Sequence, residues 1–442
     1  MIALGHDNNV TLYLGSDAVL KAYLGDELVY PNTQPTPSYD TQYLTFAVVE
    51  DGTTFQFNQN GLEYSLDDGL TWNSLGASVN TPSLNTGDKI MFRGNLTITQ
   101  GYGIGQFSSN GHFNIEGNPL SLVDDTDFAD ITDLTGMNQI FFQLFYGTDV
   151  VDASNLALTA TILSQDCYTS MFENCTSLTT APELPATTLA NYCYYNMFKG
   201  CTSLTTAPAL PATTLADDCY NYMFQGCTSL VTAPELPATT LADSCYLGMF
   251  QGCTSLVSAP ELPAMTLAER CYNEMFYGCT GLTTAPALPA TTLANYCYYN
   301  MFNRCTGLVN APALPATTLA NTCYETMFSG CTSLTTAPEL PATTLAYQCY
   351  YMMFSGCTGL VNAPALPAET LVNNCYKYMF RNCTNLNYIK AMFTTTPSNT
   401  YTEGWLRDVA ATGTFVKNTA ARWAVTGDYG VPTGWTVQTA SQ

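Results

Sequence analysis

Apolar residues recur along residues 167–383 at a fixed period. The frame C-Y-x-x-M-F-x-x-C starts at residues 167, 193, 219, 245, 271, 297, 323, 349 and 375, so every interval is 26 residues. A second constant phrase, T-x-L-x-x-A-P-x-L-P-A-x-T-L, runs between the frames, as at residues 176–189. One such unit cannot bury its apolar face alone, so we predict that nine units stack into a solenoid with contacts between neighbours.

The spacing within each frame predicts the local structure. The first Cys, the Met and the second Cys stand at positions i, i+4 and i+8. On a helix these positions fall within about 80° of one another, and the Tyr and Phe widen the stripe to about 140°. We therefore expect a helix of about two turns with one buried face. The first Pro of A-P-x-L-P ends a helix and favours extended backbone, which predicts one short parallel strand per unit.

A solenoid needs atypical ends, and both flanks of the repeats offer them. Upstream, Leu144 and Phe145 align with the M-F of the frame, which puts Ile140 and Thr148 at the two Cys positions. Downstream, WLRDVAATG aligns with Trp405 and Gly413 at those positions. The expected fold class is an α+β repeat protein, a solenoid with degenerate caps that follows a small all-β domain.

Upstream of the repeats the pattern indicates β-structure. Residues 10–31 alternate apolar and polar positions and predict two strands joined by glycine turns. The segments YLTFAVVE, TFQFNQ, LEYSL, KIMFRG and HFNIEG predict the strands of a sandwich-like domain. We divide the chain into an N-terminal β attachment segment (1–32), a Pro-rich linker (33–39), an all-β domain (40–137), the repeat region (138–393) and a C-terminal cap (394–442).

Composition narrows the classes of function. The chain has 442 residues, 35 of them acidic and 12 basic, with a net charge of −23. This charge repels nucleic acid and anionic membranes, so neither is an expected partner. No apolar run reaches the roughly 18 residues of a membrane-spanning helix. The N-terminal MIALGHDNN lacks the basic start and apolar core of a secretory signal, so we expect a protein made and used without that route.

All 18 cysteines lie in the repeats, at spacings that alternate between 8 and 18 residues. Zinc sites favour pairs two to four residues apart, and no C-x-x-C occurs. Cysteines eight apart on one helix are about 12 Å distant, beyond disulfide reach, although pairing of first and second cysteines from different units stays open. A catalytic thiol needs a base, and His6 and His112 lie outside the repeats. We predict two ladders of buried apolar thiols.

Two acidic motifs stand in the β-domain. SLDDGLTW at 65–72 matches the Asp-box S-x-D-x-G-x-T-W, in which Asp67 accepts backbone N–H bonds, Gly69 takes positive φ and Trp72 packs beneath. We interpret it as a structural hairpin turn. The segment VDDTDFADITD offers Asp124, Asp125 and Asp127 as weak Ca²⁺ candidates, with a solvated turn as the favoured alternative. We predict no metal site, no cofactor and no catalytic residue.

Recognition, if the repeats provide it, must use their variable positions, which follow the constant Tyr and Phe and precede each frame. Tyrosines beside amides suit sugar or protein surfaces, and a merely solvated face is the competing interpretation. The candidates are Tyr195, Asn196, Tyr222, Tyr299, Tyr351 and Tyr378.

The phrase M-F-x-G-C-T-S-L, as at residues 197–204, resembles the A-F-x-x-C-x-x-L core of BspA-like leucine-rich repeats. The likeness covers residues 138–393, but the usual repeat is a few residues shorter and lacks the second Cys and the second Pro. The resemblance implies a right-handed leucine-rich-repeat solenoid and surface-exposed interaction proteins rather than enzymes.

The ends carry a second resemblance. LYLGSDAVLKAYLGDELVYPN at 12–32 is similar to N-terminal segments of virion proteins from gut Bacteroidetes phages, including crAss-like phages, and residues 413–440 resemble their closing segments. This implies a virion fibre or decoration protein assembled in the host cytoplasm, where thiols stay reduced. Its partners would be other virion proteins through the N-terminal segment, a host surface glycan or protein, and copies of itself, as a trimer by analogy with phage fibres. A bacterial cell-surface adhesin is the alternative, and a glycan-active enzyme is disfavoured.

Overall fold

The computed structural model describes residues 13–14, 17–18, 21–24, 27–31, 39–99, 101 and 103–440. It divides into two compact units, Met1–Tyr39 and Asp40–Gln442, which we treat separately. No helix in the described part of the chain has the length and apolarity to cross a membrane.

The described residues of the first unit form four short strands in two antiparallel pairs, where the sequence predicted two strands. β1 (Tyr13–Leu14) pairs with β2 (Asp17–Ala18), and β3 (Lys21–Leu24) pairs with β4 (Glu27–Pro31). The linker residues 33–38 lie outside the described residues. The predicted attachment role of residues 1–32 stays a prediction.

The β-domain has all five strands that the alternation predicted. They are β5 (Leu44–Val48), β6 (Phe55–Phe57), β7 (Leu62–Ser65), β9 (Lys89–Gly94) and β11 (Phe113–Gly117). A six-stranded sheet has the order β12-β11-β5-β9-β7-β8, with β8 at Asn73–Leu75 and β12 at Val150–Leu156, and β6 pairs with β10 (Phe107–Ser109). Phenylalanine rings packed edge to face fill the core. The ring centres of Phe46 and Phe55, for example, are 4.9 Å apart. Short 3-10 helices occupy Tyr39–Thr41, Pro119–Leu122, Phe128–Asp130 and, near the C-terminus, Gly427–Tyr429.

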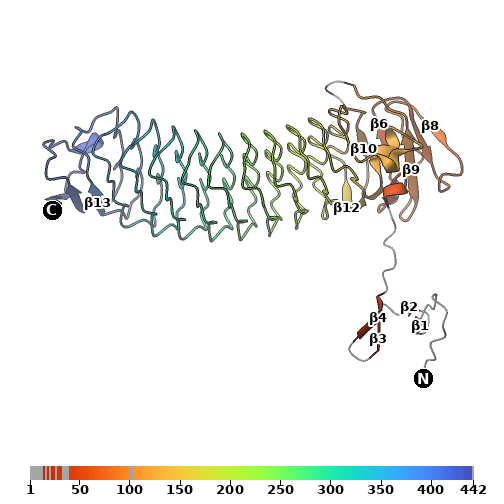
Figure 1. The fold of residues 1–442 in the computed structure, drawn as a ribbon, viewed down its shortest axis with the longest axis horizontal. Helices are drawn as coiled ribbons and strands as arrows, with labels where there is room; N and C mark the ends of the chain where they lie inside the picture. Colours follow the sequence, from red (N-terminus) through yellow and green to blue (C-terminus); the bar gives the residue numbers. More distant parts are fainter. Residues whose placement is uncertain are drawn as a thin grey trace. The chain divides into compact units, whose positions relative to one another are not determined.

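The 26-residue units stack side by side, in a row from β12 towards β13 (Figure 1). The segment from two residues before the first Cys to the residue before the second Cys, here called the turn segment, is not the predicted helix: its residues are in hydrogen-bonded turns. Along the turn segment, successive backbone N–H groups donate in turn to a carbonyl of the next unit and to a carbonyl three residues back in the same unit. Asn196 donates to Asn221 of the next unit at 3.0 Å, whereas Met197 donates to Tyr194 three residues back at 3.2 Å. The prediction of α-helices in an α+β fold class is therefore wrong. Half of these backbone N–H groups donate to the neighbouring unit, so the hydrogen bonds of an α-helix do not form.

Left-handed backbone recurs every fourth residue of the turn segment. In one unit, Tyr192, Asn196 and Gly200 have φ of 59°, 56° and 75°. The segment therefore repeats every four residues, and the Cys, Met and Cys of each frame all point inwards, as they would on a helix of period 3.6. Over the nine residues of one frame, a period of four residues and the helical period of 3.6 residues bury the same side chains.

The interior is a set of ladders that run through the units. Tyr194 stacks on Tyr220 with 5.7 Å between the ring centres, and Phe198 stacks on Phe224 with 5.6 Å between the ring centres. The Cys and Met side chains of every frame have no exposed surface. On the opposite side of each unit the predicted strand shrinks to a single parallel bridge, such as Thr180 to Thr206.

The β-domain seals the first unit. Ile140 and Thr148 take the two Cys positions as predicted, since Phe141 donates to Cys167 and the Thr148 hydroxyl lies 3.6 Å from the Cys175 sulfur. From the β-domain, Phe107 donates its N–H to the Leu144 carbonyl at 2.8 Å, as a preceding unit would. The hydrophobic core is therefore continuous from the β-domain into the repeats.

The C-terminal cap differs from the predicted alignment by four residues. Phe380 donates its N–H to Trp405 at 2.9 Å, so Trp405 occupies the Met position and Tyr401 the first Cys position, while Gly413 lies beyond the turn segment. The parallel strands β13 (Tyr388–Ala391), β14 (Thr414–Lys417) and β15 (Thr436–Thr439) form one sheet in this order; β13 precedes Tyr401 in the chain, and β14 and β15 follow Trp405. Three of the four tryptophans close the core, and their indole N–H groups donate to backbone carbonyls: Trp405 to Gly430, Trp423 to Phe393 and Trp435 to Ala410.

Candidate functional site

The variable side chains after the constant Tyr and Phe form one surface, which we call the turn face. Backbone pairing between neighbouring units, as from the Asn196 N–H to the Asn221 carbonyl 25 residues further on, recurs from unit to unit and keeps equivalent positions in columns. Because the Cys, Met and Phe point into the core, the two residues after Tyr and the two after Phe are the ones that line this surface.

All six predicted recognition residues lie on the turn face, and none is fully exposed. Asn196 is buried, and the five tyrosines are half-buried. They do not form one cluster, because they belong to five different units. Tyr195, Tyr299 and Tyr351 occupy the column directly after the constant Tyr, whereas Asn196, Tyr222 and Tyr378 occupy the next one.

A polar network crosses the middle of the turn face and centres on Glu274. The carboxylate accepts from Gln251 at 3.0 Å and from Asn300 at 3.3 Å. Gln225 donates to Gln251, and Thr326 donates to Asn300, so the network extends over five units. Amide side chains thus hold this carboxylate in place without a cation.

Tyr222 reaches this network by lying across the intervening unit. A Cβ added at Gly248 would come within 2.1 Å of the Tyr222 ring, so only glycine leaves room for the ring there. Burial, and then the charge of Glu274, raises the pKa of Tyr222 to about 12. The phenol therefore stays protonated and remains a hydrogen-bond donor.

Near the C-terminal end of the turn face, an ion pair replaces the amides. The Tyr378 hydroxyl donates to Glu403 at 2.7 Å, and Lys377 lies 3.2 Å from the same carboxylate. The hydrogen bond from Tyr378 lowers the pKa of Glu403, and it raises the pKa of Tyr378. Tyr378 is thus already occupied by an intramolecular partner.

Sequence analysis missed Glu325, which stands between Tyr299 and Tyr351 in the first column. Its side chain is 9% exposed, and burial raises its pKa to about 7. The signal was present in the sequence, because Glu325 is the one acidic residue at a frame position that otherwise holds Tyr, Asn, Leu, Thr or Lys. Glu325 did not stand out among the 35 acidic residues of the chain, because the burial of a side chain cannot be predicted from a single position of the sequence.

The cysteines are buried free thiols, which confirms the two ladders. The second ladder also makes hydrogen bonds, because each second Cys donates its S–H to the Phe carbonyl of the preceding unit, as Cys279 does to Phe250 at 3.0 Å. Burial raises the pKa of Cys279 to about 12, which suppresses the thiolate. His112 pairs instead with Glu50 at 2.7 Å, and His6 lies outside the described residues.

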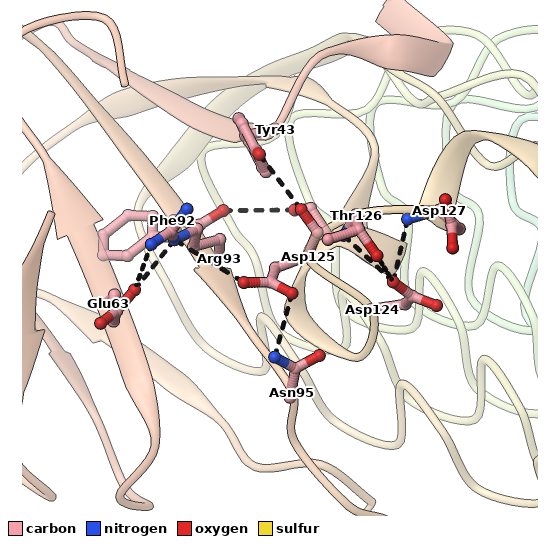
Figure 2. Close-up of polar contacts among 10 residues, drawn as sticks. Tyr43, Glu63, Phe92, Arg93, Asn95, Asp124, Asp125, Thr126 and Asp127 are labelled. Atoms are coloured by element: carbon pink, nitrogen blue, oxygen red, sulfur yellow. Dashed lines mark hydrogen bonds and ion pairs between the residues drawn. The ribbon is translucent and has the colours of Figure 1, made fainter. Parts of the chain in front are cut away.

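The acidic turn of the β-domain is held by its own hydrogen bonds (Figure 2). Asp124 accepts from the backbone N–H of Thr126 at 3.0 Å and of Asp127 at 2.9 Å, which lowers the pKa of Asp124. Asp125 accepts from Asn95 at 3.0 Å. Within residues 39–99, 101 and 103–440, no three side chains are grouped as metal ligands, so the calcium candidates Asp124, Asp125 and Asp127 gain no support.

Beside this turn, Arg93 pairs with Glu63 at 2.8 Å (Figure 2). The Arg93 guanidinium also lies 4.2 Å from the Trp72 ring centre, at the edge of an open groove of about 730 Å³. Trp72 belongs to the Asp-box, whose predicted mechanics are present. Asp67 accepts from the backbone N–H of Thr71 at 2.8 Å, and Gly69 has φ of 83°. These contacts account for the motif as a turn.

A family model described as the BspA type leucine rich repeat region matches in six copies, over residues 138–283, 220–360 and 300–404. No curated protein and no solved structure matches the chain. The matched residues include the whole predicted repeat region and extend into the C-terminal cap.

Proposed function

The chain belongs to the family of proteins with BspA type leucine-rich repeats, and from this membership we propose that it is a non-enzymatic binding protein whose turn face contacts a partner surface. In this proposal the nine units wind as one right-handed solenoid. The family supports a surface or binding role.

The observation that carries the proposal is the contrast between the inside and the turn face of the units. The interior repeats the same Cys, Tyr, Met and Phe in every frame, whereas the turn face varies from unit to unit. Half-buried tyrosines beside amides and carboxylates offer rigid area together with hydrogen bonding, a composition found at recognition surfaces. A face that only needed solvation would not require Glu274 to be held by two amides.

We propose a phage virion as the setting, with the chain as a fibre or decoration appendage that assembles in the host cytoplasm. The N-terminal segment would dock on other virion proteins, and the repeat region would contact a host surface glycan or protein. Buried thiols suit a reducing compartment during assembly. A homo-oligomer, a trimer by analogy with phage fibres, belongs to this proposal.

A bacterial cell-surface adhesin is the second candidate, and the repeat family itself favours it. Mass spectrometry of purified virions and surface labelling of intact bacteria that produce the native protein separate the two settings. We expect the chain among virion proteins. Its absence from virions together with its presence on the cell surface would establish the adhesin instead.

The binding role is tested with the labelled full-length protein on intact host cells. The variant Tyr195→Ala, Tyr222→Ala, Tyr299→Ala removes three turn-face rings and should reduce cell binding at least about tenfold. A matched control changes exposed residues of the same three units on the bridge side: Thr206→Ala, Thr232→Ala and Asn310→Ala. Equal binding by both variants, with unchanged thermal unfolding, would refute the role of the turn face.

A further inference from the structure

Glu325 is a buried carboxylate on the turn face. Its side chain is 9% exposed, and it accepts a hydrogen bond from the Gln348 amide at 3.3 Å. No ion pair to it occurs within the described residues. Burying a carboxylate without a positive partner is unfavourable, so such a group is a candidate for a functional role.

Two tyrosines flank this carboxylate in register. The Asn300 N–H donates to the Glu325 carbonyl at 3.0 Å, and the Thr326 N–H donates to the Tyr351 carbonyl at 2.8 Å, which places Tyr299, Glu325 and Tyr351 in successive units of one column. The ladder just beneath has ring spacings of 5.8 and 5.9 Å across the same units. Burial, and then the charge of Glu325, raises the pKa of Tyr299 and of Tyr351, so both phenols lie close to this carboxylate.

The surrounding charges do not neutralise Glu325. Glu274 lies near Tyr299 and adds negative charge, whereas Lys377, two units further along the column, is paired with Glu403 at 3.2 Å. Arg381 lies against the Tyr378 ring at 5.7 Å. The position between Tyr299 and Tyr351 is therefore anionic, and the charge of Arg381 acts on its Tyr351 side.

We propose that Glu325, Tyr299 and Tyr351 form a subsite for an organic ammonium group at the end of a small ligand. The carboxylate supplies the counter-charge, and the faces of the two rings supply cation–π attraction. A protonated amino sugar and a choline head group carry the same chemistry. This subsite rests on the proposed binding role of the turn face and specifies the ligand chemistry of its centre.

The test uses the full-length protein and isothermal titration with choline, glucosamine and N-acetylglucosamine. We expect choline to bind at pH 8 and glucosamine to bind at pH 7.5, where its amine is still largely protonated, and the neutral N-acetylglucosamine to bind at least about tenfold more weakly. Choline keeps its charge at every pH, so its binding should weaken at least about tenfold at pH 5, where Glu325 is protonated. Glucosamine binding better than choline identifies an amino sugar, and the reverse identifies a quaternary head group.

Glu325→Gln should abolish this binding, and Tyr351→Leu should weaken it, whereas Glu339→Gln, which removes an exposed carboxylate elsewhere on the units, should leave it unchanged. Binding of neither ammonium probe, or equal binding to Glu325→Gln, would overturn the subsite. The cell-binding assay keeps the two proposals apart. If Glu325→Gln fails to affect cells while the three-tyrosine variant loses binding, the turn face stands and the ammonium subsite does not.

Discussion

Replacing Glu325 with Gln should stabilise the protein at pH 8 and leave its stability unchanged at pH 4. Burial raises the pKa of Glu325 from 4.5 to about 7, so the folded state binds more protons than the unfolded state between these values. Stability therefore falls as the pH rises through this window, and the full cost applies above pH 7. Below pH 4.5 both states are protonated, and Gln mimics the neutral acid.

The magnitude follows from the shift of the pKa. A shift of this size corresponds to about 3 kcal/mol at most, and solvent contact at the edge of the side chain reduces the expected gain to about 1–2 kcal/mol. This free energy is local, because neighbouring units of a repeat protein open separately. It corresponds to roughly 5- to 30-fold slower opening of the backbone around Glu325.

Hydrogen exchange with mass spectrometry measures this opening. Peptides that contain Asn300 and residues 322–330 should exchange more slowly in Glu325→Gln than in the wild type at pH 8, and equally at pH 4. Glu339→Gln is the matched control and should exchange as the wild type does at both pH values. Equal slowing by Glu325→Gln at pH 4 and pH 8, or equal slowing by the control, would refute the assignment of the cost to a buried charge.

The other predictions concern the packing of the units. Titration of the unfolded protein without reductant should find close to 18 thiols, whereas the folded protein should react slowly because burial suppresses the thiolates; a count far below 18 would show paired cysteines. Cys279→Val should cost about 1 kcal/mol, because it removes the bond to the Phe250 carbonyl, and Cys279→Ser should retain more protection in hydrogen exchange. Met301→Ala should cost about 2–5 kcal/mol in urea unfolding, since it opens a cavity in a fully buried ladder. Asp67→Ala should cost about 1–2 kcal/mol and speed exchange of residues 65–72 alone.

The sequence predicted the features that depend on composition and period. The interval of 26 residues identified the repeat, and the lack of paired spacing favoured buried thiols over metal ligands. Ile140 and Thr148 were assigned correctly because an apolar or small side chain at a ladder position signals a cap. The five β-domain strands followed from alternation, since period 2 distinguishes a half-buried strand from other structure.

The sequence predicted which positions of the units form the turn face, but it did not predict the contacts between their side chains. The six candidate recognition residues lie on the turn face, as predicted, because variability within a repeat marks its outward positions; their role in recognition stays a prediction. Their partners were not, since Tyr222 reaches Glu274 two units away only because Gly248 leaves room between them. The same limit hid Glu325, whose burial depends on the side chains of the units on either side.

By itself, the sequence determined which side chains face inwards, because apolar residues four apart are buried by either a helix or a turn segment. Only the tertiary structure decided between the two. The N–H groups that a helix would bond internally instead join neighbouring units, so the choice depends on a second unit being present. The register of the cap was decided in the same way, since Trp405 fills the Met position only when its carbonyl receives the N–H of Phe380.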